Sequence, residues 1–570
     1  MHSKTGCCLE VKRIGDDMKN LLQSMVKMNR RGASAISAFC LLVILLFCRF
    51  TYGRQQIAQF GITWTFDKDY TVGQFANGDY WVIGPVTIIK IDPTSVELNG
   101  RMINGSMINP SPRLGQTQGY DSAMYGKFAR PGNYDPGLNV ARPNGRDLSE
   151  SNPLVLQPEC SLVSAISTAR AESSTILQTA AILTILGSSA PEGSFRPPYC
   201  GADKTIRFNI SQLDYSLLAG LKPVPGAPGL STVERTFERP WLDHVPNWPN
   251  SYLHPVDNMP GFGRELATEI GVGALMLNLN FENARKETLL IRYLQLGIDL
   301  YGIIQDGGKD NWVNNGAHNS GRKWPILFAG LMLNDPCMKN IGRPDIPDYG
   351  PLHPEYVHFG EDDQTFYVSQ VDVDATHSTQ WNPDKRDPQR IPYEQEDIGL
   401  PEWGIVHAIS PYRSNKFWNT AYRRVSCPSW GGFVLAAHIM GVKDLWNHDA
   451  LFDFKDRYMQ AATDWRQMSR FVEAMWDTYR KDYDPVWTMS PTLNVVAVGG
   501  SVAKVPDKEA YTLGERVRLR AVADPGYEFA GWSGGLSGME NPVAIVMHTK
   551  RTITANFTTA SKYPKSRGGK

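Results

Sequence analysis

Apolar residues three and four positions apart recur between about residues 160 and 480, and this helical period limits the possible folds more than any other pattern. Successive helices joined by long loops favour an α/α barrel or a large helical bundle. We therefore expect a mainly α fold, with an α/α barrel (toroid) over residues 161–485. The segments with this period are Ile176 to Leu186, Arg264 to Leu277, Ala284 to Ile304, Trp324 to Leu333, Trp430 to Met440 and Ala450 to Tyr479.

A short β element is expected before this body, over residues 54–160. Ile62 to Phe66 and Tyr80 to Ile89 have the β-branched and aromatic content of strands. Residues 104–150 are rich in Gly, Pro, Asn and Arg and show no hydrophobic period. Long irregular segments of this kind are often functional, so we predict a surface loop or lid there.

The N-terminus has the pattern of an export signal. Arg30 and Arg31 precede a largely apolar stretch from Ala33 to Phe47, and small residues follow near Gly53. We assign residues 1–53 to a leader and signal peptide, which predicts a secreted, cell-surface or periplasmic protein. Two alternatives are an uncleaved membrane anchor, for which the stretch is short, and a lipoprotein signal ending at Cys48.

The last part of the chain changes to alternating β patterns, which predict a small all-β module over residues 491–558. Its sequence contains Gly499-Gly500-Ser501-Val502, then Pro525-Gly526-Tyr527-Glu528-Phe529-Ala530-Gly531-Trp532, and finally Thr552 to Phe557. This series resembles the divergent B-repeat of internalin-like bacterial surface and secreted proteins. The resemblance implies an accessory module for cell-surface or matrix attachment. The basic tail, residues 559–570, is predicted to be disordered.

Composition excludes several functional classes. Lys plus Arg and Asp plus Glu both total 58, so no overall field draws the chain to nucleic acid. The mature chain keeps four cysteines, which allow three pairings that the sequence does not decide. No Cys/His cluster has zinc spacing, so we expect neither a metal nor a cofactor. The four are Cys160, Cys200, Cys337 and Cys427.

The polar loop from Gly307 to Trp324, between two predicted helices, is the first candidate site. His318 can accept a proton, and Asn315 and Arg322 can neutralise a carboxylate. Trp312 can stack on a sugar face. The structural alternative is that Asn and Gly build turns here and that His318 caps a helix.

Two further segments combine histidine, arginine and aromatic residues. One runs from Glu402 to Arg424, where Tyr422 stands beside Arg423, a cation that stabilises the phenolate of a tyrosine acting as acid or base. The other runs from Phe237 to His254. The alternatives are a helix start with Tyr422 in the core, and a structural strap.

The body resembles the α/α-barrel polysaccharide lyases that act on uronic-acid polymers such as alginate and glucuronan. This resemblance implies cleavage of an anionic polysaccharide by β-elimination, without a cofactor. It implies that Asn315 and Arg322 neutralise the uronate, that His318 is the base, and that Tyr422 is the acid, facing the same cleft. The implied substrate-binding residues are Trp312, Arg423, His254, His407 and Lys323.

Two other functions stay open. An α/α-barrel glycoside hydrolase needs two carboxylates across a cleft, and a surface adhesin needs only to bind glycans. The candidate carboxylates are Asp306, Asp310, Glu361, Glu402 and Asp449. The run Glu361 to Asp363, with Asp372 and Asp374, suggests calcium binding, a glycosidase pair or a solvated loop.

The signal pattern predicts processing between Arg49 and Gly53. Mass spectrometry of exported protein should find an N-terminus near Arg54, because small residues precede that position. A cytoplasmic, unprocessed product would contradict this prediction.

Overall fold

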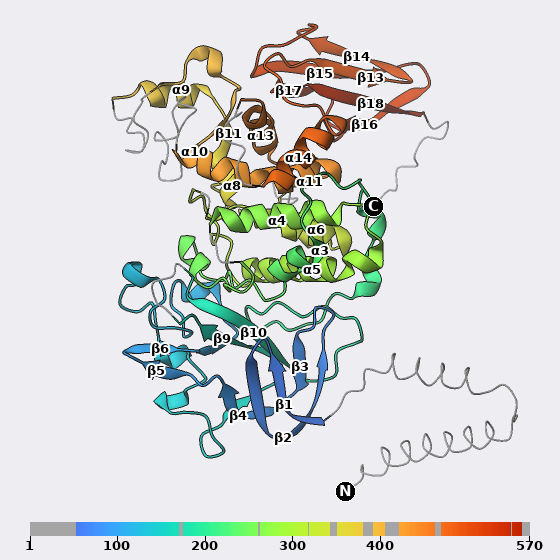
Figure 1. The fold of residues 1–570 in the computed structure, drawn as a ribbon. Coiled ribbons are helices and arrows are strands. Elements are labelled where there is room, and N and C mark those ends of the chain that lie inside the picture. Colours follow the sequence, from blue (N-terminus) through green and yellow to red (C-terminus); the bar gives the residue numbers. More distant parts are fainter. Residues whose placement is uncertain are drawn as a thin grey trace, which may run out of the picture. The chain divides into compact units, whose positions relative to one another are not determined.

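The fold is taken from a computed structural model, and Figure 1 shows it as a ribbon. The described residues are 53–169, 175–259, 263–316, 318–342, 350–379, 391–404, 421–461, 469–548 and 550–560. Residues 1–52, which hold nearly all of the predicted leader, and residues 561–570 lie outside this set. Within the described ranges, no helix combines the length and the apolar character that crossing a membrane requires.

Residues 53–186 form one curled mixed sheet of eight strands (Figure 1). Strands β7, β9, β10, β3, β2, β4 and β8 are neighbours in that order, and β1 pairs with β2. Strand β10 runs parallel to β3, whereas the β7–β9, β9–β10, β2–β3, β2–β4 and β4–β8 pairs are antiparallel. The strands are β1 (Gly53–Gln59), β2 (Ile62–Gln74), β3 (Tyr80–Ile83), β4 (Val86–Asp92), β7 (Ser106–Ile108), β8 (Leu154–Leu156), β9 (Cys160–Ser167) and β10 (Leu177–Leu186).

Strand β10 corrects the helix predicted from Ile176 to Leu186. Its alternate residues enter two different cores: Ile182 packs with the helical body, whereas Leu183 packs inside the curled sheet. A strand buried on both faces reads as a continuous apolar run, which periodicity cannot distinguish from a buried helix. Pairing with β9 and β3 decides the outcome.

The region predicted as a loop or lid, residues 104–150, is largely irregular but well packed. It follows a hairpin of β5 (Val96–Leu98) and β6 (Arg101–Ile103). Tyr120 and Tyr125 are both buried in the main core. The middle of this region is therefore core structure, and its role as a lid stays a prediction.

Arg196 joins the sheet to the helical body. Its Nε donates to Asp79 Oδ2 at 2.6 Å, and Nη2 donates to Asp299 Oδ2 at 2.6 Å. Asp79 precedes β3, and Asp299 lies in the second half of α5 (Asn283–Gln305). All three side chains are at most 4% exposed. Because buried charges are stable only when paired, this contact fixes the sheet against α5.

The helical period locates the helices of the body well. The predicted helix from Arg264 to Leu277 coincides with α4 (Arg264–Leu277), and Ala284 to Ile304 lies within α5. The segment from Ala450 to Tyr479 contains two helices, α13 (Asp449–Ala461) and α14 (Arg470–Tyr479). The other elements are α3 (Leu230–Thr236), α6 (Lys323–Met332), α7 (Pro336–Lys339), α8 (Gly360–Gln364), β11 (Thr365–Tyr367), α9 (Gln370–His377), β12 (Pro401–Trp403), α10 (Ala421–Ser426), α11 (Gly431–Ile439) and α12 (Lys443–Trp446).

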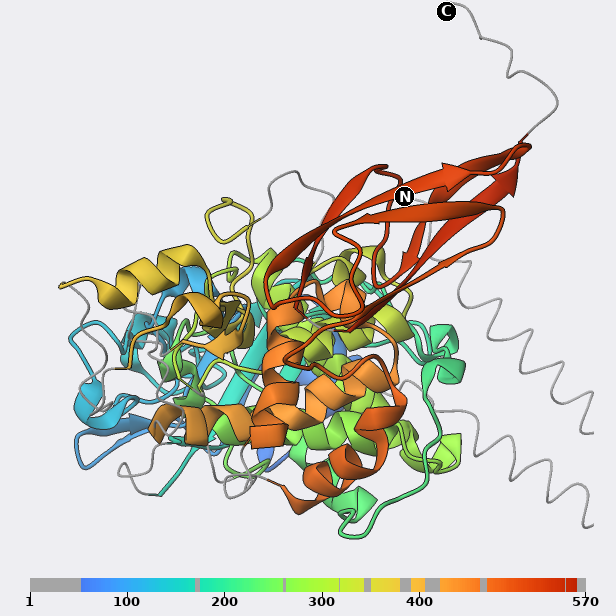
Figure 2. The ribbon, with the colours of Figure 1, turned by 90° about the horizontal axis from the view of Figure 1, so that it is seen from above.

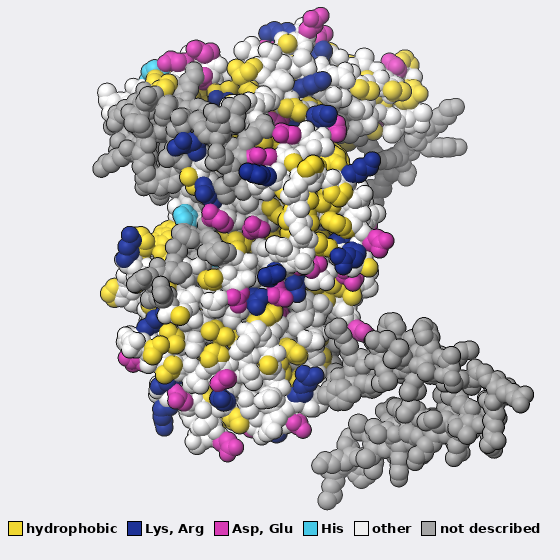
Figure 3. All heavy atoms as spheres, in the orientation of Figure 1, with side chains coloured by type: hydrophobic (Ala, Val, Ile, Leu, Met, Phe, Trp, Pro, Cys, Tyr) yellow, Lys and Arg dark blue, Asp and Glu magenta, His cyan; other side chains and the backbone are white. Residues whose placement is uncertain are grey.

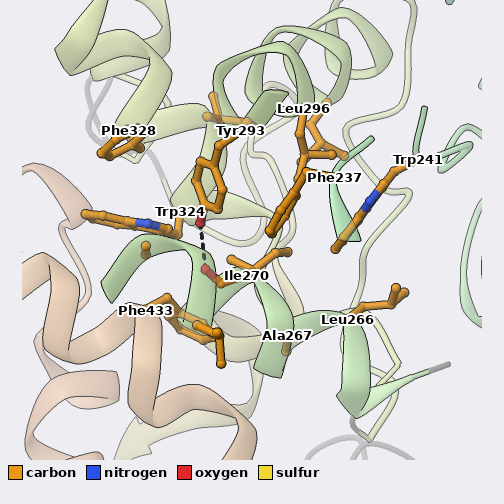
Figure 4. Close-up of a cluster of buried hydrophobic side chains, with 14 of the residues drawn as sticks. Phe237, Trp241, Leu266, Ala267, Ile270, Tyr293, Leu296, Trp324, Phe328 and Phe433 are labelled. Atoms are coloured by element: carbon orange, nitrogen blue, oxygen red, sulfur yellow. Dashed lines mark hydrogen bonds between the residues drawn. The ribbon is translucent and has the colours of Figure 1, made fainter. Parts of the chain in front are cut away.

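Helices α4 and α11 cross at a pair of glycines. A Cβ atom on Gly271 would lie 2.7 Å from the Cα of Gly432, so neither position has room for a side chain. Figure 4 shows the aromatic core beside this crossing, where the Tyr293 hydroxyl donates to the Ile270 carbonyl at 2.8 Å. Trp324 and Phe433 lie near that bond in the same view.

The C-terminal module contains two three-stranded sheets, and its long strands are visible in Figure 2. One sheet has the order β13-β18-β16 and the other β14-β15-β17. Their inner faces enclose a separate core that includes Val517, Leu519 and Trp532. The strands are β13 (Leu493–Ala497), β14 (Gly500–Val505), β15 (Glu515–Ala523), β16 (Tyr527–Gly534), β17 (Val543–Met547) and β18 (Arg551–Thr559).

The predicted mainly α fold is wrong. The chain is about 32% helical and 26% strand, and its curled sheet and several smaller sheets exclude an α/α barrel as the architecture. The helical segments after residue 230 are largely as predicted. The error arises before that point, because the sheet extends through β10 and the helical body packs against it rather than closing into a toroid.

Replacing Arg196 with Met should destabilise the fold by about 3–5 kcal/mol, because two buried carboxylates lose their common partner. Urea unfolding of the Arg196→Met variant measures this change. The matched control is Arg207→Gln, which breaks the exposed Arg207–Asp203 pair and should change stability by no more than about 0.5 kcal/mol. Equal effects at the two sites would contradict the prediction.

Candidate functional site

Surface charge alone does not mark a site on this molecule. Figure 3 shows acidic and basic side chains interspersed over one face, as the equal totals of the two charges predict. A cavity is more informative, because ligand sites are concave and bring polar groups together.

A polar groove of about 810 Å³ lies beside α8, and we call it the α8 groove. It is bordered by α8, β11, the first residues of α13 and the segment that precedes α8. Its polar and charged lining residues are Asn314, Lys323, Tyr356, His358, Asp362, Asp363, Thr365, Tyr367, Asn447, His448 and Asp449.

Asp363 organises one wall of the α8 groove. His358 Nδ1 lies 3.0 Å from both carboxylate oxygens of Asp363, and the Asn314 backbone N–H donates to Oδ2 at 3.3 Å. The His358 backbone N–H also donates to the Lys309 carbonyl at 2.9 Å. One carboxylate therefore holds the imidazole beside the Asn-rich loop that precedes α6.

The His358 imidazole has the surroundings of a general acid or base. The hydrogen bond to Asp363 raises the pKa of His358 above its ordinary value. An ionised Asp363 accepts the Nδ1 proton, which leaves Nε2 as the exchanging nitrogen. Nε2 lies 3.9 Å from Asp310, and the Tyr356 ring meets the imidazole edge-on at 4.9 Å between centroids.

A buried ion pair lies at the base of the groove. Lys323 Nζ pairs with Asp362 and donates to the Trp446 carbonyl at 2.7 Å. The Trp446 indole N–H donates to the other Asp362 oxygen at 2.7 Å. The charge of Lys323 is thus already balanced within the protein. A substrate carboxylate would have to compete with Asp362 for the Lys323 ammonium group, which its predicted role in substrate binding requires.

Glu361 is fully buried next to this pair. One of its oxygens accepts the Gly321 backbone N–H at 2.9 Å, and the other accepts no hydrogen bond among the described residues. Burial, reinforced by the charge of Asp362, raises the pKa of Glu361 to about 8. The carboxyl group is therefore largely protonated at neutral pH.

The C-terminal module contacts residues that line the groove. His548 stacks on Tyr367 with 3.6 Å between ring centroids, and Arg551 pairs with Asp449 at 3.2 Å. Although burial alone would raise it, the pKa of Asp449 is lowered by Lys443 and Arg551. The module thus contacts two residues that line the groove.

Several of the site residues predicted from the sequence are internal. Arg322 pairs with Asp243 at 2.8 Å, and Arg423 pairs with Glu402 at 3.1 Å. All four of these side chains are buried. Because each charge is balanced inside the protein, these arginines serve the core, not an open cleft.

Trp312 and His254 are also buried in the core. Trp312 stacks on Phe359 at 6.1 Å, so its ring is not available to a sugar. His254 packs edge-on against Trp241, and burial lowers its pKa to about 3. His254 is therefore neutral at physiological pH.

Asn315 and His318 are half-buried in the loop before α6. The Asn315 amide donates to Asn247 Oδ1, and the His318 backbone N–H donates to the Asn315 carbonyl at 3.2 Å. Neither residue lines the α8 groove. His407 lies outside the described residues, and the Tyr422 side chain is likewise not described, so the pairing of His318 with Tyr422 stays a prediction.

The carboxylates considered for a hydrolase are dispersed. Glu402 is buried between Arg423, Arg457 and Tyr393, and Asp306 lines a second cavity of about 300 Å³ together with Cys200 and Cys337. Of the five candidates, Asp449 alone lines the α8 groove, and Asp310 stands near His358.

The acidic run suggested for calcium is divided among other partners. Asp362 binds Lys323, Asp363 binds His358, and Asp372 accepts hydrogen bonds from Ser369. Over the described ranges, no group of three potential ligands is arranged to hold a metal ion. Cys160, Cys200, Cys337 and Cys427 are all free thiols.

Sequence reasoning missed His358 and its neighbours. The signal was present as the run His358-Phe359-Gly360-Glu361-Asp362-Asp363, in which a histidine stands five residues before an aspartate across the start of a short helix. The acidic residues Glu361 to Asp363 by themselves suggest calcium binding, a glycosidase pair or a solvated loop, and only together with His358 do they indicate an imidazole–carboxylate pair. A carboxylate so close in sequence is a natural partner for an imidazole.

Comparison with known proteins identifies the C-terminal module. Residues 491–561 match the divergent InlB B-repeat domain, which confirms the prediction for this part of the chain. Neither the comparison with curated proteins nor that with solved structures found a match. The family match does not extend to the sheet or the helical body.

The raised pKa of Glu361 predicts a pH-dependent stability. Its folded pKa of about 8 exceeds the unfolded value of about 4.3, so the folded state binds the extra proton. The stabilisation is complete below the unfolded pKa and is lost as pH rises through about 8. Replacing Glu361 with Gln should remove much of the decrease in the free energy of unfolding at alkaline pH. Urea unfolding at a series of pH values from acid to alkaline measures this. An unchanged slope would contradict it.

Proposed function

We propose that this chain is an exported polysaccharide lyase that cleaves a uronic-acid polymer by β-elimination in the α8 groove. The observation that supports this most is the position of Asp363, which holds both the His358 imidazole and the Asn314 loop at one wall. His358 supplies a base and the Asn314 side chain lines the same groove, and these are two groups that removal of a proton next to a uronate carboxylate requires.

The proposed roles follow the positions of the groove residues. The Asn314 side-chain amide donates hydrogen bonds to the uronate carboxylate and disperses its charge, which acidifies the proton on C5. His358 Nε2 takes that proton, while Asp363 stabilises the imidazolium through Nδ1. The electron pair forms the C4–C5 double bond, the C4–O bond breaks, and Tyr356 gives its hydroxyl proton to the leaving oxygen. No water, metal or cofactor takes part.

The charges of the groove are compatible with an anionic substrate. Its three aspartates each have a cationic or protonatable partner: Lys323 for Asp362, His358 for Asp363 and Arg551 for Asp449. Paired carboxylates repel an incoming uronate less than isolated ones do.

A glycoside hydrolase is the second candidate, because Asp363 and Asp449 both line the groove. Hydrolysis requires one carboxyl group to be protonated so that it can act as the acid. The lowered pKa of Asp449 suits the ionised member of such a pair. Asp363 would then have to be the acid, although its contacts with His358 and the Asn314 N–H favour an ionised carboxylate, so we prefer elimination. A non-catalytic glycan-binding protein is the third outcome that the experiment separates.

Purified protein should release unsaturated products from alginate or glucuronan, seen as new ultraviolet absorbance of the conjugated double bond. Reducing ends without this absorbance would indicate a hydrolase, and neither signal would indicate binding alone. The rate should rise with pH through the raised pKa of His358, because the base must be unprotonated.

The His358→Asn variant should lose activity by about 10² or more, because the proton acceptor is removed. Its melting temperature should change little, since His358 is partly exposed. The matched control is His353→Asn, a histidine of the same segment that does not line the groove. Full activity in His358→Asn would reject this assignment.

A further inference from the structure

Strand β15 presents three arginines on one face of the C-terminal module. Arg516, Arg518 and Arg520 are exposed, whereas Val517 and Leu519, which alternate with them, are buried. Alternate residues of a strand lie about 6.6–7 Å apart on the same face. The three arginine side chains therefore leave the strand from positions that form a row on one face.

The residues on both sides of this line are small or aliphatic. On β14, Ala503 is opposite Arg520 and Val505 is opposite Arg518. On β17, Ala544 is opposite Arg518 and Val546 is opposite Arg516. Residues directly opposite each other in a sheet share a face, and none of these four paired neighbours is acidic.

The positive charge of this face is not balanced by the described chain. No ion pair joins Arg516, Arg518 or Arg520 to a carboxylate in the described ranges. Glu515, which begins the strand, pairs instead with Lys508 at 2.6 Å. This differs from the chain as a whole, in which Lys plus Arg and Asp plus Glu are equal in number.

The geometry indicates the chemical class of the partner. A guanidinium group binds a carboxylate through two parallel hydrogen bonds, and a row of three suits a linear polyanion better than a compact ligand. The strand-paired neighbours include no aromatic residue on which a nucleic-acid base could stack. Small flanking side chains leave the row accessible to a broad chain such as a polysaccharide.

We propose that Arg516, Arg518 and Arg520 form a binding strip for a carboxylated polysaccharide, separate from the α8 groove. This strip gives the module a defined role in retaining the protein on an anionic glycan matrix. Binding at the strip does not depend on turnover in the groove, so the two proposals can fail independently.

The full-length triple variant Arg516→Gln, Arg518→Gln, Arg520→Gln tests the strip. Affinity electrophoresis in gels containing alginate should show a loss of affinity of about tenfold or more, because three exposed charge pairs are removed. Affinity of the unaltered protein should fall as salt is added, and neutral dextran should not retard it. Retention of alginate affinity by the triple variant would overturn the proposal.

A matched control removes three exposed arginines that do not form a row, in the variant Arg130→Gln, Arg235→Gln, Arg285→Gln. It makes the same change in net charge and should keep its alginate affinity. Equal loss in both variants would show a general charge effect and overturn the strip. Circular dichroism confirms that both variants are folded.

Two further measurements identify the partner and separate the proposals. Stronger strip-dependent binding to phosphatidylglycerol vesicles or duplex DNA than to alginate would reject a polysaccharide partner. In a His358→Asn background, which prevents cleavage of the polymer, the three arginine substitutions should still lower alginate affinity by about tenfold or more. No further loss of affinity in that background would place the affinity in the groove and overturn a separate strip.

Discussion

The ion pairs of Arg196 with Asp79 and Asp299 are the contact on which the rest of the structure depends. They join the residue that precedes β3 to the second half of α5, and all three groups are removed from water. A buried guanidinium group without its carboxylates would be strongly unfavourable, so few arrangements of sheet and helices satisfy it. This contact restricts how the curled sheet meets the helical body. Helix α6 packs against α5, and Lys323 at the start of α6 lines the groove.

Carboxylates with charged or hydrogen-bonded partners also hold the wall of the α8 groove. Asp363 binds His358 and the backbone at Asn314, so one carboxylate connects two segments distant in sequence. Asp362 connects Lys323 to Trp446 in a similar way. Asp363 both holds the groove wall and raises the pKa of His358, so the architecture of the groove and its proposed chemistry depend on the same carboxylate.

The helices could be predicted because their period is local. The helix α4 matches its predicted bounds, and α13 and α14 lie in one predicted segment, since an amphipathic face is readable in a single window. Strand β10 could not be read in this way, because it is buried on both faces and its partners β9 and β3 lie elsewhere in the chain. The barrel prediction failed because of this segment and the sheet around it.

The sequence alone determined most helices, the C-terminal module and the richness of the loops in polar residues. It did not determine which of those residues are accessible. Arg322 is neutralised by Asp243, whereas His358 lines a groove beside Asp363. Only the tertiary structure decides this, because folding determines whether a charged group is enclosed with its partner, which is 79 residues away for Arg322, or faces a groove, as His358 does although its partner is five residues away.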